Sequence, residues 1–249
     1  MDSVKNTLAV FRRDLKAYFE SPVAYVFMVG FLLLTGCLTF YFAHFYERRA
    51  ADLYWFFFWH PWVYLLLVPA ATMGLWAEER RSGTIELLLT MPITLRQAAL
   101  GKFLAAWVFI AIGIALTFPI VITTYILGNP DGGAIACGYL SSALVAAMYV
   151  AVGMLTSAMT RSQVISFVIS MLICLLLLLA GFPPVTEIFA RLGDKWNWLV
   201  NAVAALSFMP HYESMQRGVI DLRDLAYFAS VVVFMFCAAH VVLENRKSA

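Results

Sequence analysis

The side chains able to support catalysis or bind metals are few in this sequence and lie far apart. No two of the four histidines have the spacing of metal ligands: His44, His60, His211 and His240. The four cysteines lie in or beside apolar stretches and are interpreted as small core residues: Cys37, Cys137, Cys174 and Cys237. The sequence also contains no Gly-x-x-x-x-Gly-Lys-Ser/Thr, His-Glu-x-x-His or Gly-x-Ser-x-Gly run. We therefore expect no enzyme activity, no metal or cofactor held by this chain and no nucleic-acid partner.

One connector, WAEERRSGTIELLLTMPITLRQAALGKFLAAW, instead places four consecutive charged residues between two strongly apolar segments. Ser82 and Gly83 predict a break in the helix that precedes them, because serine favours a cap and glycine weakens a helix interior. A short helix is expected from Thr84 to Met91, with Pro92 ending it. On these residues alone, a helix that transmits force from a soluble partner and an ordinary cytoplasmic loop are favoured equally.

The composition identifies the elements that must position this connector. The chain has 249 residues, of which 63% are apolar and 13% are charged. Soluble domains average about 45–50% apolar and about 25% charged residues. Several apolar runs approach or exceed the roughly 20 residues needed to cross a bilayer, and they are continuous rather than alternating. The sequence therefore predicts an all-α integral membrane protein.

The N-terminal segment, residues 1–21, differs from the apolar runs. Val4, Leu8, Phe11 and Leu15 fall on one helical face, while most charged residues fall off it. This pattern predicts an amphipathic helix at the membrane interface, and the alternative is a helix packed on a partner. The segment has no apolar core or cleavage site of a signal peptide.

Residues 22–249 are predicted to form one domain of six transmembrane helices. Ser21 and Pro22 begin the first, Thr94 and Gln97 form a capping box before the third, and Asp221 and Asp224 precede the sixth. The expected spans are 22–45, 54–77, 95–127, 135–159, 163–182 and 222–243. Because an even number of spans returns the chain to its starting side, both termini are expected on one face. That face carries eleven of the 17 lysines and arginines, so it is predicted to be cytoplasmic.

The predicted spans carry almost no ionisable residues. Proton-coupled carriers usually need such groups on the transport pathway, despite their cost in the membrane. A secondary carrier or an intramembrane enzyme is therefore disfavoured.

The connector also carries a resemblance. EERRSGTIELLLTMPITLRQAALGK closely resembles the signature of ABC-2 family export permeases: a glutamate, then Gly-Thr-hydrophobic-Glu, a run of leucines, a proline and a Gly-Lys pair. The N-terminal helix resembles the elbow helix of this family, and six spans match its usual permease. LSFMPHYESMQRGVIDLRDLAYFAS, residues 206–230, resembles the gliding-motility-associated and copper-processing-associated branch.

The resemblance implies roles for individual residues. A coupling helix, about residues 83–91, would enter a cleft of a separately encoded ATPase. The residues of this coupling region are Glu78, Glu79, Arg80, Arg81, Gly83, Thr84, Ile85, Glu86, Leu88, Leu89 and Pro92. Arg12, Arg13 and Lys16 would hold the elbow helix against anionic lipid headgroups. Short extracytoplasmic helices are expected within residues 185–221, before the sixth span.

The resemblance further implies an exporter made of two permease chains, identical or different, and two ATPase chains in the bacterial inner membrane. ATP and Mg²⁺ would bind the ATPase chains. An alternative is a membrane scaffold that anchors an ATPase to a motility or periplasmic maturation machine without transporting a substrate.

Overall fold

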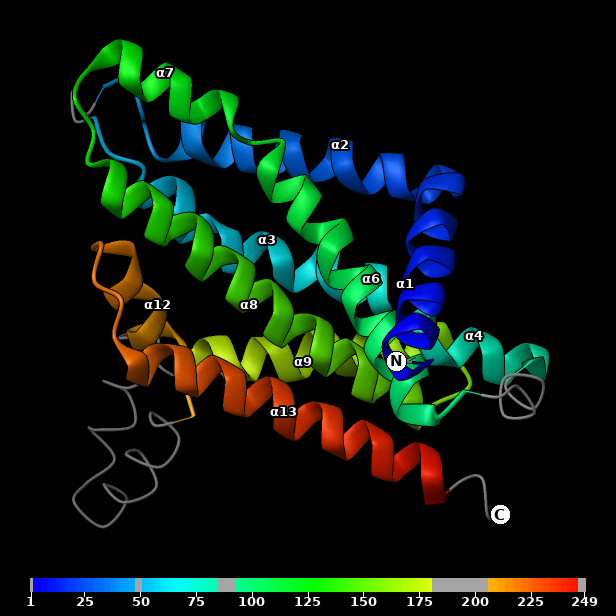
Figure 1. Ribbon diagram of the computed structural model, residues 1–249. Helices are drawn as coiled ribbons and strands as arrows, with labels where there is room; N and C mark the ends of the chain where they lie inside the picture. The colour runs from blue at the N-terminus through cyan, green and yellow to red at the C-terminus, as the bar shows by residue number, and fades with distance from the viewer. Residues whose placement is uncertain (1, 48–50, 85–92, 181–205, 246–249) are drawn as a thin grey trace, which may run out of the picture.

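The computed structural model describes residues 2–47, 51–84, 93–180 and 206–245, and every regular element in these ranges is a helix (Figure 1). In chain order they are α1 (Asp2–Glu20), α2 (Pro22–Cys37), the π-helical segment η1 (Leu38–Phe42), α3 (Tyr54–Thr72), α4 (Gly74–Ser82), α6 (Leu95–Ala115), α7 (Pro119–Leu127), α8 (Gly132–Met159), α9 (Gln163–Leu179), α12 (Met209–Gln216) and α13 (Leu222–Asn245). The predicted all-α class is confirmed for these ranges.

Five stretches of helix are long and apolar enough to cross a membrane. They are Ala24–Phe42, Tyr54–Ser82, Leu95–Leu127, Gly132–Met159 and Leu222–Asn245. Helix α9 is also apolar but has 17 residues. At 1.5 Å per residue it extends about 26 Å, slightly less than the roughly 30 Å of a hydrocarbon core. The chain is therefore a multi-pass membrane protein, and the sixth span stays a prediction because residues 181–205 lie outside the described ranges.

Helix α8 lies at the centre of the bundle. It packs against α3, α4, α6, α9, α12 and α13. Small residues allow this close packing, as is common between membrane helices. A Cβ added at Gly138 would collide with the Phe57 ring, and one added at Gly153 would collide with Thr72. The two glycines thus let α3 approach α8 at two levels of the bundle.

The third predicted span is broken rather than continuous. Helix α6 ends at Ala115 and α7 begins at Pro119, which has no N–H to donate within a helix. At the break, the Thr117 hydroxyl donates to the Ile114 carbonyl oxygen at 2.6 Å and lies 3.0 Å from the Tyr139 hydroxyl. Such side-chain bonds satisfy polar groups that a helix break leaves open inside a membrane.

Two helix starts are set by local caps, of which the sequence predicts the first. Thr94 and Gln97 form a reciprocal capping box at the start of α6, with N···O distances of 3.0 and 3.3 Å. Helix α8 begins after Asp131, whose Oδ1 accepts hydrogen bonds from the backbone of Gly133 and Ala134. It starts three residues before the predicted Ile135, because Asp131 caps the helix directly after the turn.

The two ends of the bundle carry different elements. Helix α1 lies across one end, near α4 and the last turns of α13, while the start of α8 and helix α12 lie at the other (Figure 1). The start of α1 and the end of α13 thus lie at the same end of the bundle. Helix α12 falls in the predicted extracytoplasmic segment 185–221, of which residues 185–205 lie outside the described ranges.

Candidate functional site: a charged junction of three helices

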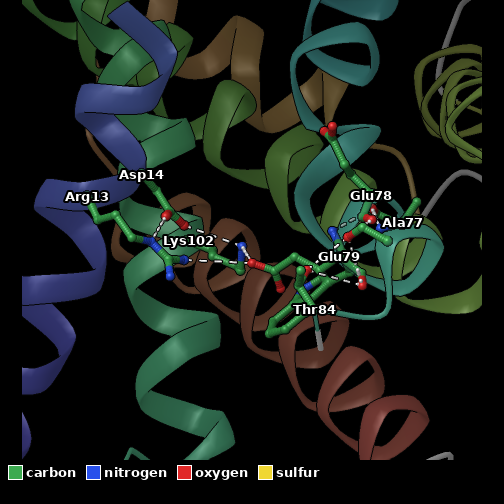
Figure 2. A network of polar contacts seen from close by, with 10 residues as sticks. Arg13, Asp14, Ala77, Glu78, Glu79, Thr84 and Lys102 are labelled. Carbon is green, nitrogen blue, oxygen red and sulfur yellow. Dashed lines mark hydrogen bonds and ion pairs between the residues drawn. The ribbon is translucent and has the colours of Figure 1, made fainter. Parts of the chain in front are cut away.

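Four charged side chains meet where α1, α4 and α6 come together at one end of the bundle. Arg13 and Asp14 come from α1, Glu79 from α4 and Lys102 from α6 (Figure 2). We call these four residues the charged junction. Two of them are basic and two are acidic, so their formal charges balance.

Lys102 is the centre of the charged junction. Its Nζ lies 2.8 Å from Glu79 Oε1 and 3.4 Å from Asp14 Oδ2, and its side chain is only 6% exposed. Arg13 lies at the rim, where its Nε donates to Asp14 Oδ1 at 2.7 Å and its Nη2 lies 3.7 Å from Glu79 Oε1. The hydrogen bond to Asp14 raises the pKa of Arg13; burial opposes this shift, while the charges of Asp14 and Glu79 add to it.

A buried ammonium needs compensation for the water it loses. Here two carboxylates supply it, together with the Trp76 ring, whose centroid lies 5.2 Å from Lys102 Nζ. A cation over an aromatic face at this distance is attracted by the ring. Trp76 itself is fully buried. The lysine is thus held by α1, α4 and α6 at once.

Glycine next to this lysine lets α1 approach α6. A Cβ added at Gly101 would lie 2.7 Å from Val10 Cβ, closer than side chains tolerate. Farther along α1, the Tyr18 hydroxyl donates to the Ala71 carbonyl oxygen of α3 at 2.8 Å. Its ring stacks on Phe109 of α6, with centroids 4.8 Å apart. Burial raises the pKa of Tyr18, so its hydroxyl keeps the proton that it donates. Helix α1 is therefore fixed to both α3 and α6.

Helix α4 is fixed on its other side to α8. The Ser157 hydroxyl accepts from the backbone N–H groups of Trp76 and Ala77, at 2.9 and 3.0 Å, and donates to the Met73 carbonyl oxygen at 2.8 Å. These three backbone groups flank the break between α3 and α4, and one buried serine satisfies them all. In addition, Arg80 Nη1 donates to the Ala158 carbonyl oxygen at 2.6 Å.

The helix ends where the sequence predicts. Gly83 has a left-handed backbone with φ of 74°, which glycine adopts without strain at the end of a helix. The Ser82 hydroxyl donates back to the Glu78 carbonyl oxygen at 2.8 Å and lies 2.9 Å from the Thr84 hydroxyl. The connector thus leaves a well-anchored helix at a defined residue.

The predicted coupling residues divide into three groups. Glu79 and Arg80 contact the bundle as described above, whereas the surface carries Glu78, Arg81, Gly83 and Thr84. The third group lies outside the described residues: Ile85, Glu86, Leu88, Leu89 and Pro92.

The residues predicted to contact lipid are not equivalent. Arg12 and Lys16 are exposed, and Lys16 Nζ lies 3.3 Å from Glu20 Oε1 one turn later. Arg13 is half-exposed and takes part in the charged junction. A role for Arg12, Arg13 and Lys16 at lipid headgroups stays a prediction.

Sequence reasoning missed three residues of this site: Asp14, Lys102 and Ser157. Lys102 had a visible signal, since it is a charge seven residues after the start of a predicted span, and charges inside membrane helices usually have partners. Asp14 and Ser157 had none, because nothing local in the sequence distinguishes them from other polar residues.

The charged junction is not arranged as a metal-binding site. Among the residues that the structure describes, no group of three or more His, Cys, Asp or Glu side chains is placed to hold a metal ion. The arrangement instead links three helices through ion pairs, directly beside the connector.

Comparison with known proteins assigns this chain to a family. The model of a family described as ABC-2 family transporter protein matches residues 63–195, just over half of the chain. No curated protein matches the sequence. The matched region starts in α3 and contains α4, the connector, α6, α7, α8 and α9. The chain therefore belongs to the ABC-2 family of transporter proteins, as a multi-pass membrane component of the permease type.

Proposed function

We propose that this chain is the permease subunit of an ATP-driven exporter, in which the connector after α4 docks a separate ATPase subunit. ATP and Mg²⁺ bind that ATPase, and this chain performs no catalysis of its own. Two permease chains, identical or different, pair with two ATPase chains in the bacterial inner membrane. The end of the bundle that carries α1 and α4 faces the cytoplasm, together with both termini.

The observation that carries this proposal is the way in which α4 is held. Ser157 and Arg80 join it to α8, and Glu79 joins it to α1 and α6 through Lys102. A force applied at the end of α4 therefore reaches three helices through short polar contacts. An ordinary surface loop needs no such anchoring.

The mechanism of this proposal uses the contacts of the charged junction. ATP binding draws the two ATPase subunits together and moves the connectors with them. Movement of α4 shifts Glu79 relative to Lys102, while Arg13 remains available to pair with either Asp14 or Glu79. The charged junction stays neutral throughout, so the helices can change their arrangement without leaving an unpaired buried charge.

The test uses the complex with an ATPase subunit, reconstituted in liposomes. Leu88→Asp places a charge on the apolar side of the predicted coupling helix, and Glu79→Lys reverses the charge that meets Lys102. The double variant should uncouple ATP hydrolysis from transport. The rate of ATP-dependent transport should fall by tenfold or more. Lys5→Met, at an exposed lysine of α1, serves as the control. Unchanged coupled activity in the double variant would show that the connector is not the docking element.

The scaffold alternative is separated by a second measurement on the same complex. An exporter should show ATPase activity that rises when its substrate is present. A scaffold should form the complex normally yet show no stimulation by any extract fraction from the periplasm or membrane.

A further inference from the structure

A small cavity lies at the end of the bundle opposite the charged junction. It has a volume of about 90 Å³ and is formed by the start of α3, the turn before α8 and the end of α12. Its polar lining consists of Asp52, Tyr54, Asp131 and Gln216, and the Phe57 side chain contributes an aromatic wall. The proposed function makes no use of this cavity.

In both Asp52 and Asp131, one carboxylate oxygen accepts hydrogen bonds from nearby backbone N–H groups. Oδ1 of Asp52 accepts from the Tyr54 backbone at 3.2 Å, and Oδ1 of Asp131 accepts from the backbone of Gly133 and Ala134. Neither carboxylate makes an ion pair with a residue of the described ranges. The second oxygen of each is therefore available to a ligand in the cavity.

Gln216 supplies the independent evidence for a ligand. Its side chain lines the cavity but is only 6% exposed, and neither its amide oxygen nor its amide nitrogen has a hydrogen-bond partner among the described residues. The amide lies near enough to the Tyr212 hydroxyl to act on it as a hydrogen-bonding group, but that hydroxyl donates its proton to the Phe57 carbonyl oxygen and the contact does not satisfy either amide atom. Buried polar atoms without partners are costly and rare, so a group that bonds to this amide is expected.

The lining defines the chemistry of that group. Three acceptors, the free oxygens of Asp52 and Asp131 and the Gln216 carbonyl oxygen, match the three N–H donors of a primary ammonium. The rings of Tyr54 and Phe57 favour a cation as well. The Gln216 N–H₂ group needs an acceptor, which an oxygen two carbons from the ammonium would provide. A metal ion is a poorer match, because the described residues offer no group of three carboxylate, histidine or cysteine ligands.

The guanidinium group of Arg217 could bind a second part of the same ligand. Arg217, whose side chain is 72% exposed, follows Gln216 directly and lies 3.9 Å from Glu213. Both residues are near enough to influence Tyr54 electrostatically. An arginine there can bind a phosphate next to the ammonium. Aromatic residues at the start of α3, such as Trp55 and Trp59, are typical of the level of lipid headgroups.

We propose that this cavity binds the primary ammonium of an ethanolamine group, supplied by a phosphatidylethanolamine headgroup or by a free ethanolamine compound. The ammonium contacts both aspartates and Gln216, and the phosphate of a lipid lies at Arg217. This proposal is independent of ATPase docking, since it involves the other end of the bundle.

The test compares ethanolamine with choline, whose trimethylated nitrogen has the same charge but no N–H to donate. Full-length protein is placed in nanodiscs of equal amounts of phosphatidylethanolamine and phosphatidylcholine, and the lipids it retains are counted by native mass spectrometry. The wild type should retain phosphatidylethanolamine at least tenfold in preference. Asp52→Asn with Asp131→Asn keeps the Oδ1 acceptors and should reduce the preference by roughly tenfold for each charged bond lost.

Controls exclude indirect effects. Asp221→Asn changes a matched carboxylate, which also accepts a backbone hydrogen bond but does not line the cavity, and should leave the preference intact. Gln216→Met keeps the side-chain size and should reduce the preference. The proposal is wrong if the aspartate variant keeps the wild-type preference. It is also wrong if the wild type shows no lipid preference and free ethanolamine, added to phosphatidylcholine nanodiscs, does not raise its melting temperature.

The same nanodiscs separate the sources of the ligand. Suppose that the protein shows no lipid preference but its melting temperature rises by several degrees with free ethanolamine and not with choline. That result assigns the site to free amines. Stabilisation by Mg²⁺ alone would assign the cavity to a metal ion and overturn the ammonium assignment.

Discussion

Lys102→Met should destabilise this protein more than its small change in volume suggests. The methionine keeps most of the packing of the side chain but removes the ion pairs to Glu79 and Asp14. Removing one partner of a buried pair costs about 3–5 kcal/mol, because the remaining charge stays buried. The two carboxylate side chains are 19% and 13% exposed, and Arg13 still contacts both, so part of this cost is recovered. We expect a loss of about 2–3 kcal/mol.

The assay is thermal unfolding of the purified protein in nanodiscs. A change of 1 kcal/mol moves the melting temperature by about 2–4 °C in a chain of this size, so the variant should melt roughly 4–12 °C lower. Lys5→Met is the matched control, since that lysine is exposed on the same helix and has no assigned role. Exposed surface substitutions usually change stability by about 0.5 kcal/mol or less, so the control should shift the melting temperature by about 2 °C at most.

A double-mutant cycle tests the reasoning directly. The Lys102→Met substitution leaves the Glu79 carboxylate without its main partner, and Glu79→Gln removes that charge. The double variant should therefore be more stable than the sum of the two single effects predicts. The expected interaction free energy is about 1–2 kcal/mol. A Lys102→Met variant that melts within 1 °C of the wild type, or effects that add without any interaction term, would refute the view that the charged junction holds α1, α4 and α6 together.

Two further substitutions test the contacts around α8. Ser157→Ala removes the side chain that satisfies three backbone groups at the α3–α4 break, and thermal unfolding should show a loss of about 2 kcal/mol, whereas Ser230→Ala, at an exposed serine of α13, should change little. A similar melting temperature for the two serine variants would contradict the proposed role of Ser157. Gly153→Ala should cost about 1–3 kcal/mol because its Cβ collides with Thr72. Gly36→Ala has open space and should be neutral or stabilising by up to about 1 kcal/mol, and the opposite order of the two glycine variants would show that α3 and α8 are not in close contact at this level.

The class of this protein could be predicted from composition, because a chain in lipid must satisfy its backbone polar groups within its own helices. The residues that begin and end individual helices could be predicted as well. Thr94 and Gln97 form their capping box within one turn, and Gly83 ends a helix through its own backbone freedom. Such features depend on residues only a few positions apart, so the sequence pattern contains all the information they need.

The position of the break between α6 and α7 could not be predicted from the sequence. Pro119 is compatible with a kinked helix or with a break, and the outcome depends on whether other groups satisfy the freed backbone. Here Thr117 bonds within its own turn and to Tyr139 of α8. The partner helix therefore decides the local structure.

Sequence by itself determined that this chain forms membrane helices, that a charged connector leaves the second span, and that the chain resembles ABC-2 permeases. Only the tertiary structure showed that the connector begins from a helix fixed by Lys102 and Ser157, and that Asp52, Asp131 and Gln216 line one cavity. The reason is physical. Helical periodicity tells which residues share a face of one helix, but the rotation and height of that helix against its neighbours depend on packing contacts between residues far apart in the chain.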